Sequence, residues 1–541
     1  MEHGGALEGL VGLEATLILF VLISIGVALA ARRLQIPFTV AMVLTGLAVG
    51  LLNVQIPLLD IELDPELILL VFLPGLLFES AYHIHLEDFR DNLRPIALMA
   101  VPGLLLSMGI IGLLLYQFLG LPLLEALLFG VLISATDPIA VIALFKEFGV
   151  NERLGLLIEG ESLMNDGVSV VVYSILLSVA LGEQSFNLGQ SVLSFVISVV
   201  GGAILGWVVG ELANQIMARN DEHLLDIALT VIVAYGTFWV AEIPLNAVVS
   251  PVIAVVVAGL RVGKFGSQGG YSARSDVGIV SFWAFIAFLL NSFVFLLIGL
   301  DVELGNIGQF AGPVAITLGV ILFARAMTVY VMRFMINAVE DDKLPWAWSH
   351  TMFWGGLRGA VSIALALSLP LALPNHDLLT VLAFAYVLFS LVLQGLTMRP
   401  LLNALGLIVS TQREYEYQLR RAQVTTAQAA VDAINEMVRQ NVLVPQIADR
   451  WRAHYEREVH RRWEELASLD MEEDEALSQP TLHFAEREIA SQKKSALLRL
   501  MRVGLISERV YEQLAHDIDE RTAKSDLLPK YSIGDTLEDE N

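Results

Sequence analysis

Long uninterrupted apolar runs restrict this chain of 541 residues to a small set of folds. Residues 17–31, 97–115, 192–209 and 282–300 are almost entirely apolar. The last three runs have 18 or 19 residues, enough for a helix that rises about 1.5 Å per residue to cross nearly the whole of a hydrocarbon core of about 30 Å, and the first run covers most of it. Hydrophobic residues make up 55% of the sequence, above the usual share in soluble domains. The sequence therefore predicts an all-α protein that crosses a lipid bilayer many times.

We expect about thirteen transmembrane helices from the apolar runs and their flanking residues. They cover residues 13–31, 37–53, 65–81, 95–117, 121–145, 154–181, 189–217, 224–241, 246–261, 277–300, 312–336, 347–369 and 378–405. Lysine and arginine gather on alternate connections, while those at 54–64 and 182–188 contain neither. By the positive-inside rule, the N-terminus lies outside and the C-terminal tail is cytoplasmic.

The composition changes near residue 410, which predicts two domains. Residues 1–410 form the membrane domain, and residues 411–541 form a helical cytoplasmic tail with a regulatory role. Amphipathic helices are expected in the tail at 419–440, 446–467 and 482–522. The tail has no nucleotide-binding fingerprint, so the nature of any regulator it binds stays open. The net charge of −24 argues against a nucleic-acid partner, and nothing in the sequence calls for a cofactor.

A proline interrupts the fifth predicted span at Ser134-Ala-Thr-Asp-Pro138. Pro138 has no N–H to donate to the carbonyl of Ser134, and its ring clashes there, so the helix should open. The freed carbonyls and the Thr136 hydroxyl could bind a cation, and Asp137 would neutralise the positive end of a half-helix. A plain proline kink with a capping aspartate is the simpler alternative.

The sixth predicted span carries a matching polar set. Ser162 and Asp166 are spaced i, i+4 and so share one helix face, while Glu161 and Asn165 form the adjacent stripe. An ionisable residue at membrane depth indicates a functional site. We expect a Na⁺ site made by Asp166, Ser162 and Thr136, with Asp137 and Asn165 beside it. A structural ion-pair network without a transport role is the alternative.

Competition between a proton and a cation for one carboxylate is enough to produce exchange. Burial disfavours the ionised form of Asp166, so the group could bind a proton near neutral pH and give it up to a cation. Asn165 cannot carry a second proton, as an aspartate there could. One cation would then exchange for one proton, and the exchange would be electroneutral.

A second interruption is expected in the twelfth span, at Gly355-Gly-Leu-Arg-Gly359, where Gly355, Gly356 and Gly359 weaken the helix. The two breaks occupy matching positions in two inverted repeats of about six helices, which is typical of transporter binding sites. Arg358 is the expected partner of Glu161, because an unpaired buried charge is very costly. Arg325 in the eleventh span could cap freed carbonyls or pair with an acid such as Asp226 or Asp301.

Two further features carry weaker signals. Glu79 ends the third span and could line the access path or contact the ion indirectly, although a solvated interfacial glutamate is an alternative. His83 and His85 look like a metal-binding pair. Residues at i and i+2 diverge on a helix, however, so we expect no metal site there.

Four segments of the membrane domain together resemble the electroneutral cation–proton antiporter family, the sodium/hydrogen exchangers of bacterial type. They are FLPGLLFE at 72–79, ISATDPIAV at 133–141, EGESLMND at 159–166 and WGGLRGA at 354–360. The resemblance implies a homodimer in which a core of about six helices with crossing broken helices moves as an elevator against a dimerisation domain. It also implies that Asp166 is the ion carboxylate, that Thr136, Asp137 and Ser162 complete its shell, and that Glu161 pairs with Arg358.

The sequence therefore predicts an electroneutral Na⁺(Li⁺)/H⁺ antiporter, not an enzyme, in a bacterial inner membrane. A K⁺/H⁺ or other cation/H⁺ antiporter with the same machinery is the nearest alternative, followed by a channel or a non-transporting sensor. An intramembrane aspartyl protease using Asp137 and Asp166 does not explain Pro138 or Arg358.

Overall fold

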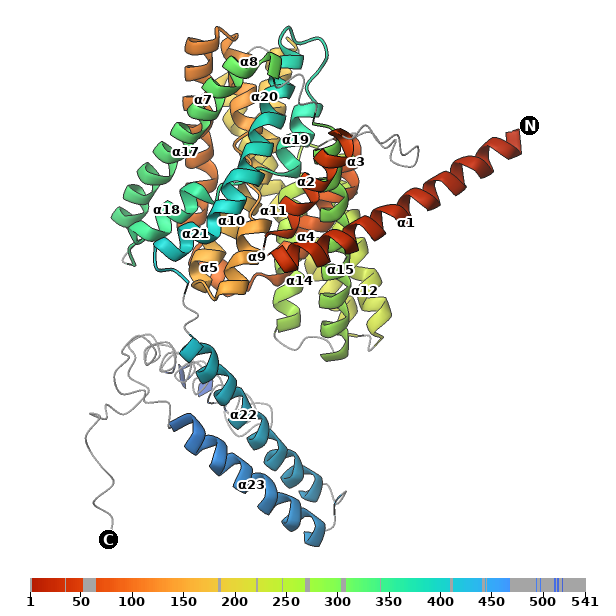
Figure 1. Ribbon diagram of the computed structural model, residues 1–541, viewed down its shortest axis with the longest axis vertical. Coiled ribbons are helices and arrows are strands. Elements are labelled where there is room, and N and C mark those ends of the chain that lie inside the picture. The colour runs from red at the N-terminus through yellow and green to blue at the C-terminus, as the bar shows by residue number, and fades with distance from the viewer. Residues whose placement is uncertain are drawn as a thin grey trace. The chain divides into compact units, whose positions relative to one another are not determined.

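The computed structural model describes most of the chain, and every regular element in that part is a helix (Figure 1). The described residues are 2–34, 36–51, 65–182, 186–219, 222–245, 247–267, 273–302, 308–340, 342–408, 412–439, 443, 445–467 and a few single positions up to 518. By internal contacts the chain divides into two compact units, Met1–Ile408 and Val409–Asn541. The division falls close to the domain boundary expected from composition.

The first unit is a bundle of apolar helices. The N-terminal half comprises α1 Glu2–Leu34, α2 Phe38–Leu51, α3 Pro65–Leu67, η2 Ile68–Phe72, α4 Leu73–His83, α5 Leu86–Asp91, α6 Leu93–Leu98, η3 Met99–Gly103, α7 Leu104–Leu119, α8 Leu123–Leu132, α9 Ile139–Phe148 and α10 Glu152–Ala180. The C-terminal half comprises α11 Leu188–Met217, α12 His223–Val231, η4 Ile232–Gly236, α13 Thr237–Glu242, α14 Pro251–Ser267, α15 Ala273–Leu300, α17 Ala311–Val339, α18 Trp346–Trp354, α19 Ala360–Leu367, α20 His376–Phe389, η5 Ser390–Gln394 and α21 Gly395–Ala404.

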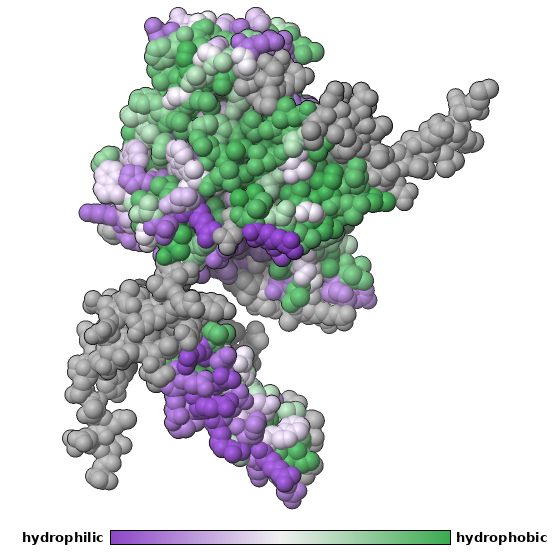
Figure 2. Space-filling view, in the orientation of Figure 1, coloured by the Kyte–Doolittle hydropathy of each residue, from purple (hydrophilic) through white to green (hydrophobic). Residues whose placement is uncertain are grey.

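Within the described residues, eight of these helices or continuous helix runs are long and apolar enough to cross a membrane. Figure 2 shows apolar residues over most of the visible face of this unit, with hydrophilic residues gathered toward its ends. The pattern is the one a lipid-embedded bundle requires, because backbone polar groups are satisfied inside each helix and apolar side chains face the acyl chains. The first unit is therefore a multi-pass membrane domain.

The bundle contains two groups of helices that pack mainly within themselves. In one group, α8 packs along α7 and α10, and α17 packs along α7. In the other, α14 packs along α11 and α4, and α15 packs along α2, α12 and α4. Small residues bring α11 and α14 together, since a Cβ on Gly206 would overlap the carbonyl oxygen of Ala254. The half-helices α8 and α18 pack with the first group, against α10 and α17, while α9 and α19 contact members of both groups.

Four spans contain a π-helical turn, in which backbone hydrogen bonds reach back five residues. These turns are η2, η3, η4 and η5, each continuous with α-helix on both sides. Pro102 lies inside η3, where the wider turn accommodates a residue that has no N–H to donate. Such turns often mark functional regions of helices.

The second unit contains a pair of helices, α22 Gln412–Arg439 and α23 Pro445–Ala467, that pack against each other. Val431 and Ile434 of α22 are buried in this pair, and Arg420 donates a hydrogen bond to the carbonyl of Glu465 at 2.9 Å. The two helices match the segments expected at 419–440 and 446–467, although α22 begins earlier. The helix expected at 482–522 lies outside the described residues.

Candidate functional site

The fifth span is unwound between α8 and α9, where residues 135–138 form no helix. Pro138 cannot donate a backbone hydrogen bond, and the N–H of Asp137 instead donates to the carbonyl of Leu357 at 2.8 Å. The Asp137 carboxyl group accepts a hydrogen bond from the N–H of Ile139 at 3.0 Å and so caps α9. The chain is thus non-helical just before Pro138, and Asp137 lies at the start of the half-helix α9.

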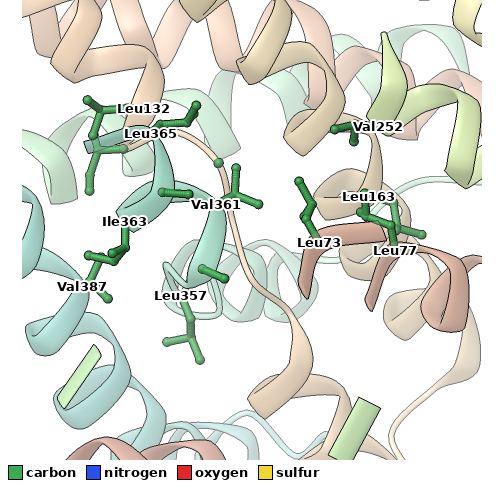
Figure 3. Packing of buried hydrophobic residues seen from close by; sticks show 14 of the residues in the cluster. Leu73, Leu77, Leu132, Leu163, Val252, Leu357, Val361, Ile363, Leu365 and Val387 are labelled. Carbon is green, nitrogen blue, oxygen red and sulfur yellow. The ribbon is translucent and has the colours of Figure 1, made fainter. Parts of the chain in front are cut away.

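The twelfth predicted span is also unwound, between α18 and α19, and it meets the first break. The hydroxyl of Ser362 donates to the carbonyl of Ala135 at 3.2 Å, and the N–H of Arg358 donates to the hydroxyl of Ser390 at 3.1 Å. Apolar side chains from α4, α8, α10, α14, α19 and α20 surround the two breaks (Figure 3). The unwound backbone is therefore enclosed in protein, as membrane depth requires.

Close approach, rather than a left-handed conformation, explains two of the glycines in this second break. A Cβ on Gly359 would overlap the carboxyl group of Asp137, and one on Gly356 would lie 2.7 Å from Nε of Arg325. The positive-φ glycines of the described chain lie elsewhere. A larger residue at either position would push a functional side chain aside.

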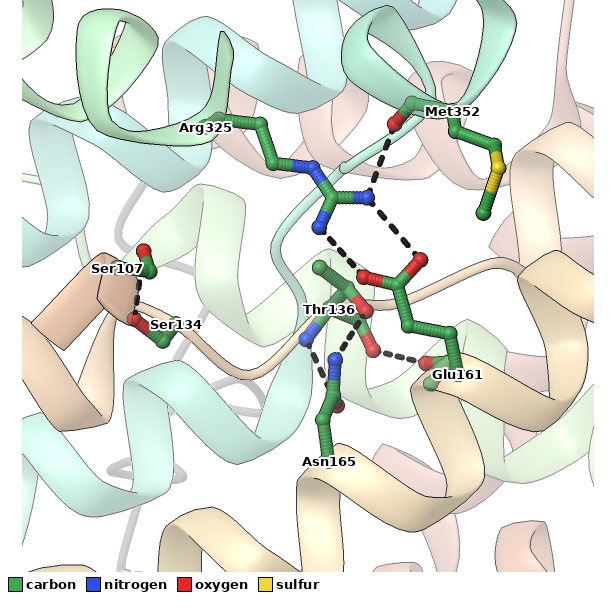
Figure 4. A network of polar contacts seen from close by, with 8 residues as sticks. Ser107, Ser134, Thr136, Glu161, Asn165, Arg325 and Met352 are labelled. Atoms are coloured by element: carbon green, nitrogen blue, oxygen red, sulfur yellow. Dashed lines mark hydrogen bonds and ion pairs between the residues drawn. The ribbon is translucent and has the colours of Figure 1, made fainter. Parts of the chain in front are cut away.

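Helix α10 holds Thr136 at three points (Figure 4). The side chain of Asn165 donates to the Thr136 hydroxyl at 2.7 Å and accepts from the Thr136 N–H at 3.3 Å. The hydroxyl of Ser162 donates to the Thr136 carbonyl. Asn165 is buried and does not line the cavity that Thr136 and Asp166 share, so it orients Thr136 from outside that cavity.

A cavity of about 80 Å³ lies where the first break faces α10 and α4. Polar residues from several elements line it: Glu79, Ser80, Thr136, Asp137, Ser162, Asp166, Asn291 and Ser362. Asp166 reaches this cavity, and its Oδ1 atom is buried without a hydrogen-bond partner among the described residues. A buried carboxylate oxygen without a donor is costly unless it binds a proton or a cation. Of the predicted set, the structure brings Thr136, Asp137, Ser162 and Asp166 together here, with Glu79 nearby.

The expected pairing of Glu161 with Arg358 is wrong. Glu161 instead forms a two-point ion pair with Arg325 of α17, with Nη1–Oε1 and Nη2–Oε2 distances of 2.5 and 3.2 Å (Figure 4). Arg325 also donates to the carbonyl of Met352 at 2.9 Å, which confirms that it caps a carbonyl freed by the second break. The planar guanidinium group reaches all three oxygens from α17, and this geometry favours Arg325.

Arg358 is 1% exposed, yet it has a different environment from the one expected. Its Nε and Nη1 atoms have no hydrogen-bond partner within the described part of the chain. The guanidinium carbon lies 6.0 Å from the centre of the Tyr386 ring, at the limit of a cation–π contact. Among the residues that the structure describes, no carboxylate forms an ion pair with the buried guanidinium group of Arg358.

Sequence reasoning missed several polar contacts near the cavity. The hydroxyl of Ser80 on α4 donates to Glu159 of α10 at 2.8 Å, and Nδ1 of His83 lies 3.5 Å from a carboxylate oxygen of Glu79. Asn291 of α15 reaches the cavity from the other helix group. Glu159 begins the EGESLMND motif that ends at Asp166, so its position in the sequence could have indicated that it lies near the site. Nothing in the local pattern distinguishes Ser80 or Asn291.

Comparisons with known proteins all point to the same family. Residues 18–404 match the family described as "Sodium/hydrogen exchanger, transmembrane". The chain is 39% identical over 419 residues to the Na(+)/H(+) antiporter ApNhaP of Aphanothece halophytica, with 76% of this chain and 79% of the relative covered. It is 34% identical over 513 residues to the Na(+)/H(+) antiporter NhaG of Bacillus atrophaeus, with 92% and 95% covered.

A solved structure shares the fold. The sodium proton antiporter MjNhaP1 from Methanocaldococcus jannaschii superposes with a TM-score of 0.59 at 21% identity, and the alignment covers 73% of this chain and 100% of that one. The family match at residues 18–404 lies within the membrane domain that contains the two touching helix breaks. The chain therefore belongs to the transmembrane sodium/hydrogen exchanger family.

Proposed function

We propose that the protein exchanges one Na⁺ or Li⁺ for one proton at Asp166. The observation that carries this proposal is the buried Asp166 Oδ1 atom, which lines the small cavity at the first break and has no hydrogen-bond donor in the described structure. A proton would satisfy this oxygen in one half of the cycle and a cation in the other. Because the two ligands compete for one group, loading one releases the other.

The surrounding residues support cation binding in distinct ways. Ser162 and Thr136 provide oxygen atoms that line the same cavity as Asp166, and hard cations favour oxygen ligands. Asn165 fixes the Thr136 backbone and hydroxyl, so that the side chain is preorganised. Asp137 caps α9, and its charge offsets the positive helix end beside the site. Its negative charge is thereby committed to α9, which leaves Asp166 as the exchanging acid.

Stoichiometry follows from the number of titrating groups. Asn165 occupies the position where a second carboxylate could bind a second proton, and it donates its amide to Thr136. With a single exchanging acid, each cycle moves no net charge. A pH difference of one unit, about 1.4 kcal/mol, would then sustain roughly a tenfold cation gradient.

The two helix groups support an alternating-access cycle of the elevator type. The breaks, α10 and α17 belong to one group, while α4, α14 and α15 belong to the other, and the cavity lies between them. We propose about thirteen spans in two inverted repeats, an outside N-terminus and a cytoplasmic regulatory tail in a bacterial inner membrane. The protein would act as a homodimer through the second group.

Proteoliposomes with an imposed pH gradient test this proposal. Addition of Na⁺ or Li⁺ to the wild type should collapse the gradient, and Asp166→Asn should abolish the response to every cation. Asp226→Asn is the matched control, because Asp226 is a buried acid of α12 that does not line the cavity. Exchange that persists in Asp166→Asn would refute the assignment, and a stronger response to K⁺ than to Na⁺ would favour a K⁺/H⁺ exchanger.

The electroneutrality of the proposed exchange is tested separately. A membrane potential set with K⁺ and valinomycin should leave the Na⁺-driven rate unchanged if one charge exchanges for one. A rate that depends on the potential would contradict the 1:1 stoichiometry but not the role of Asp166.

A further inference from the structure

Asn291 is a polar residue in a predominantly apolar helix, and it faces the cavity that holds Asp166. It lies on α15, which packs along α2, α12 and α4. Its Oδ1 atom is buried and has no hydrogen-bond donor among the described residues. Three leucines of α4 also line this cavity: Leu73, Leu76 and Leu77. An apolar residue of similar size would fit this wall at lower cost, so the amide calls for a polar partner.

The other polar groups of the cavity do not satisfy Asn291. The hydroxyl of Ser162 donates to Thr136, and the hydroxyl of Ser80 donates to Glu159. Ser362 donates to the carbonyl of Ala135. The hydroxyl groups of these three serines are therefore committed elsewhere.

Among the described residues that line this cavity, two buried side-chain oxygens have no donor, Oδ1 of Asp166 and Oδ1 of Asn291. When Asp166 is ionised, neither oxygen can donate a hydrogen bond to the other, but a cation placed between them can serve both. Hard cations take carboxylate and carbonyl oxygens together as ligands. The cavity volume of about 80 Å³ exceeds what one water needs and leaves room for such an ion.

We propose that Asn291 supplies its carbonyl oxygen to the monovalent cation held at Asp166. This inference rests on the proposed function, since it adds a ligand to the same site. The new ligand comes from the helix group that does not carry Asp166. A sliding motion between the groups would therefore remove one oxygen from the cation, so the protein binds the cation more tightly on one side of the membrane than on the other.

The test compares substitutions that remove the oxygen with one that keeps it. Asn291→Ala and Asn291→Leu lose the oxygen, whereas Asn291→Asp keeps it in nearly the same shape. Asn214→Ala is the matched control. Asn214 is a buried asparagine of α11 whose Oδ1 also lacks a donor in the described structure, but it lies outside the cavity.

In proteoliposomes, the KM for Na⁺ should rise roughly tenfold in Asn291→Ala and Asn291→Leu, the effect of one lost contact to a charged group. Their kcat at saturating Na⁺ should stay within about twofold of wild type, since Asp166 still exchanges its proton. Asn291→Asp, assayed at alkaline pH, should keep a KM close to wild type, as should Asn214→Ala. A wild-type KM in both Asn291→Ala and Asn291→Leu would overturn the proposal. So would an Asn291→Asp variant that behaves like Asn291→Leu, because shape would then be the cause.

A binding measurement keeps the proposal testable if a variant transports poorly. Na⁺ should raise the melting temperature of purified wild type and Asn291→Asp, because a ligand that binds the folded state stabilises it. The same Na⁺ concentration should stabilise Asn291→Leu much less, and equal stabilisation would count against the proposal. Asp166→Asn separates the two hypotheses: if that variant is inactive while Asn291→Leu has a wild-type KM, only the role of Asn291 fails.

Discussion

The buried pair of Glu161 and Arg325 should make a large and specific contribution to stability. Its side chains are 3% and 8% exposed, and it makes two contacts at 2.5 and 3.2 Å. At about 3 Å and an effective dielectric constant near 20, the Coulomb attraction is about 5.5 kcal/mol before desolvation is subtracted. Removing one partner leaves the other charge buried, which costs about 3–5 kcal/mol.

A double-mutant cycle measures this coupling. Glu161→Gln and Arg325→Gln should each lower the free energy of unfolding by about 3–5 kcal/mol, and the double variant should lose clearly less than the sum. Unfolding by a denaturing detergent, followed by tryptophan fluorescence, supplies the free energies. The surface pair of Arg153 and Asp342 is the control, because its Asp342 side chain is 79% exposed and the expected coupling is below about 1 kcal/mol.

The same cycle distinguishes the two arginines. Glu161 should couple strongly to Arg325 and weakly to Arg358, because only Arg325 contacts the carboxylate. Strictly additive losses for Glu161 and Arg325 would refute the reasoning. Strong coupling of Glu161 to Arg358 would restore the pairing expected from the sequence.

Two further predictions follow from local geometry. Gly359→Ala should lower the exchange rate at least tenfold and destabilise the protein by about 1–3 kcal/mol, since the new Cβ would overlap the Asp137 carboxyl group. Gly319→Ala on α17, where a Cβ meets nothing within 4 Å, should keep wild-type exchange in proteoliposomes with an imposed pH gradient. Equal losses in both variants would exclude the clash as the cause. Outside the spans, the hydrogen bond from Lys264 at 2.8 Å lowers the pKa of Glu87 below its usual value, so this pair stabilises the protein above about pH 4.3 and less as the pH falls through the lowered pKa. Glu87→Gln should therefore be less stable than wild type at pH 7 by less than about 1 kcal/mol, measured as a slightly lower melting temperature. The difference should shrink as the pH falls through the lowered pKa, and a difference that grows in acid would contradict this sign.

The spans and both breaks could be predicted from the sequence because their causes are local. Apolar length sets a membrane helix, and Pro138 cannot continue the hydrogen-bond ladder whatever surrounds it. The i, i+4 spacing of Ser162 and Asp166 likewise put them on one helix face before any packing was known. The touching of the two breaks, seen in the bond from Asp137 to Leu357, was expected from the resemblance and not from local physics.

The choice of partner for Glu161 depended on tertiary geometry and could not be predicted. Arg358 and Arg325 are both buried, and charge alone favours neither. The partner of Glu161 is the arginine whose guanidinium group can make two N–H···O contacts with the carboxylate. This depends on how α17 packs beside the second break. The role proposed for Asn291 could not be predicted for the same reason. An asparagine in an apolar helix becomes informative only when the cavity it faces is known.

The bond from Arg325 to Met352 has a consequence for how the transporter moves. In an unbroken helix, the N–H of residue 356 would donate to the Met352 carbonyl, but here the guanidinium group takes its place at 2.9 Å. Rewinding α18 into α19 would require this arginine to leave both the carbonyl and Glu161 at once. This hydrogen bond therefore favours the unwound conformation over a rewound helix. In the proposed exchange cycle, we therefore expect the unwound segment between α18 and α19 to move as one rigid unit with the helices that it joins.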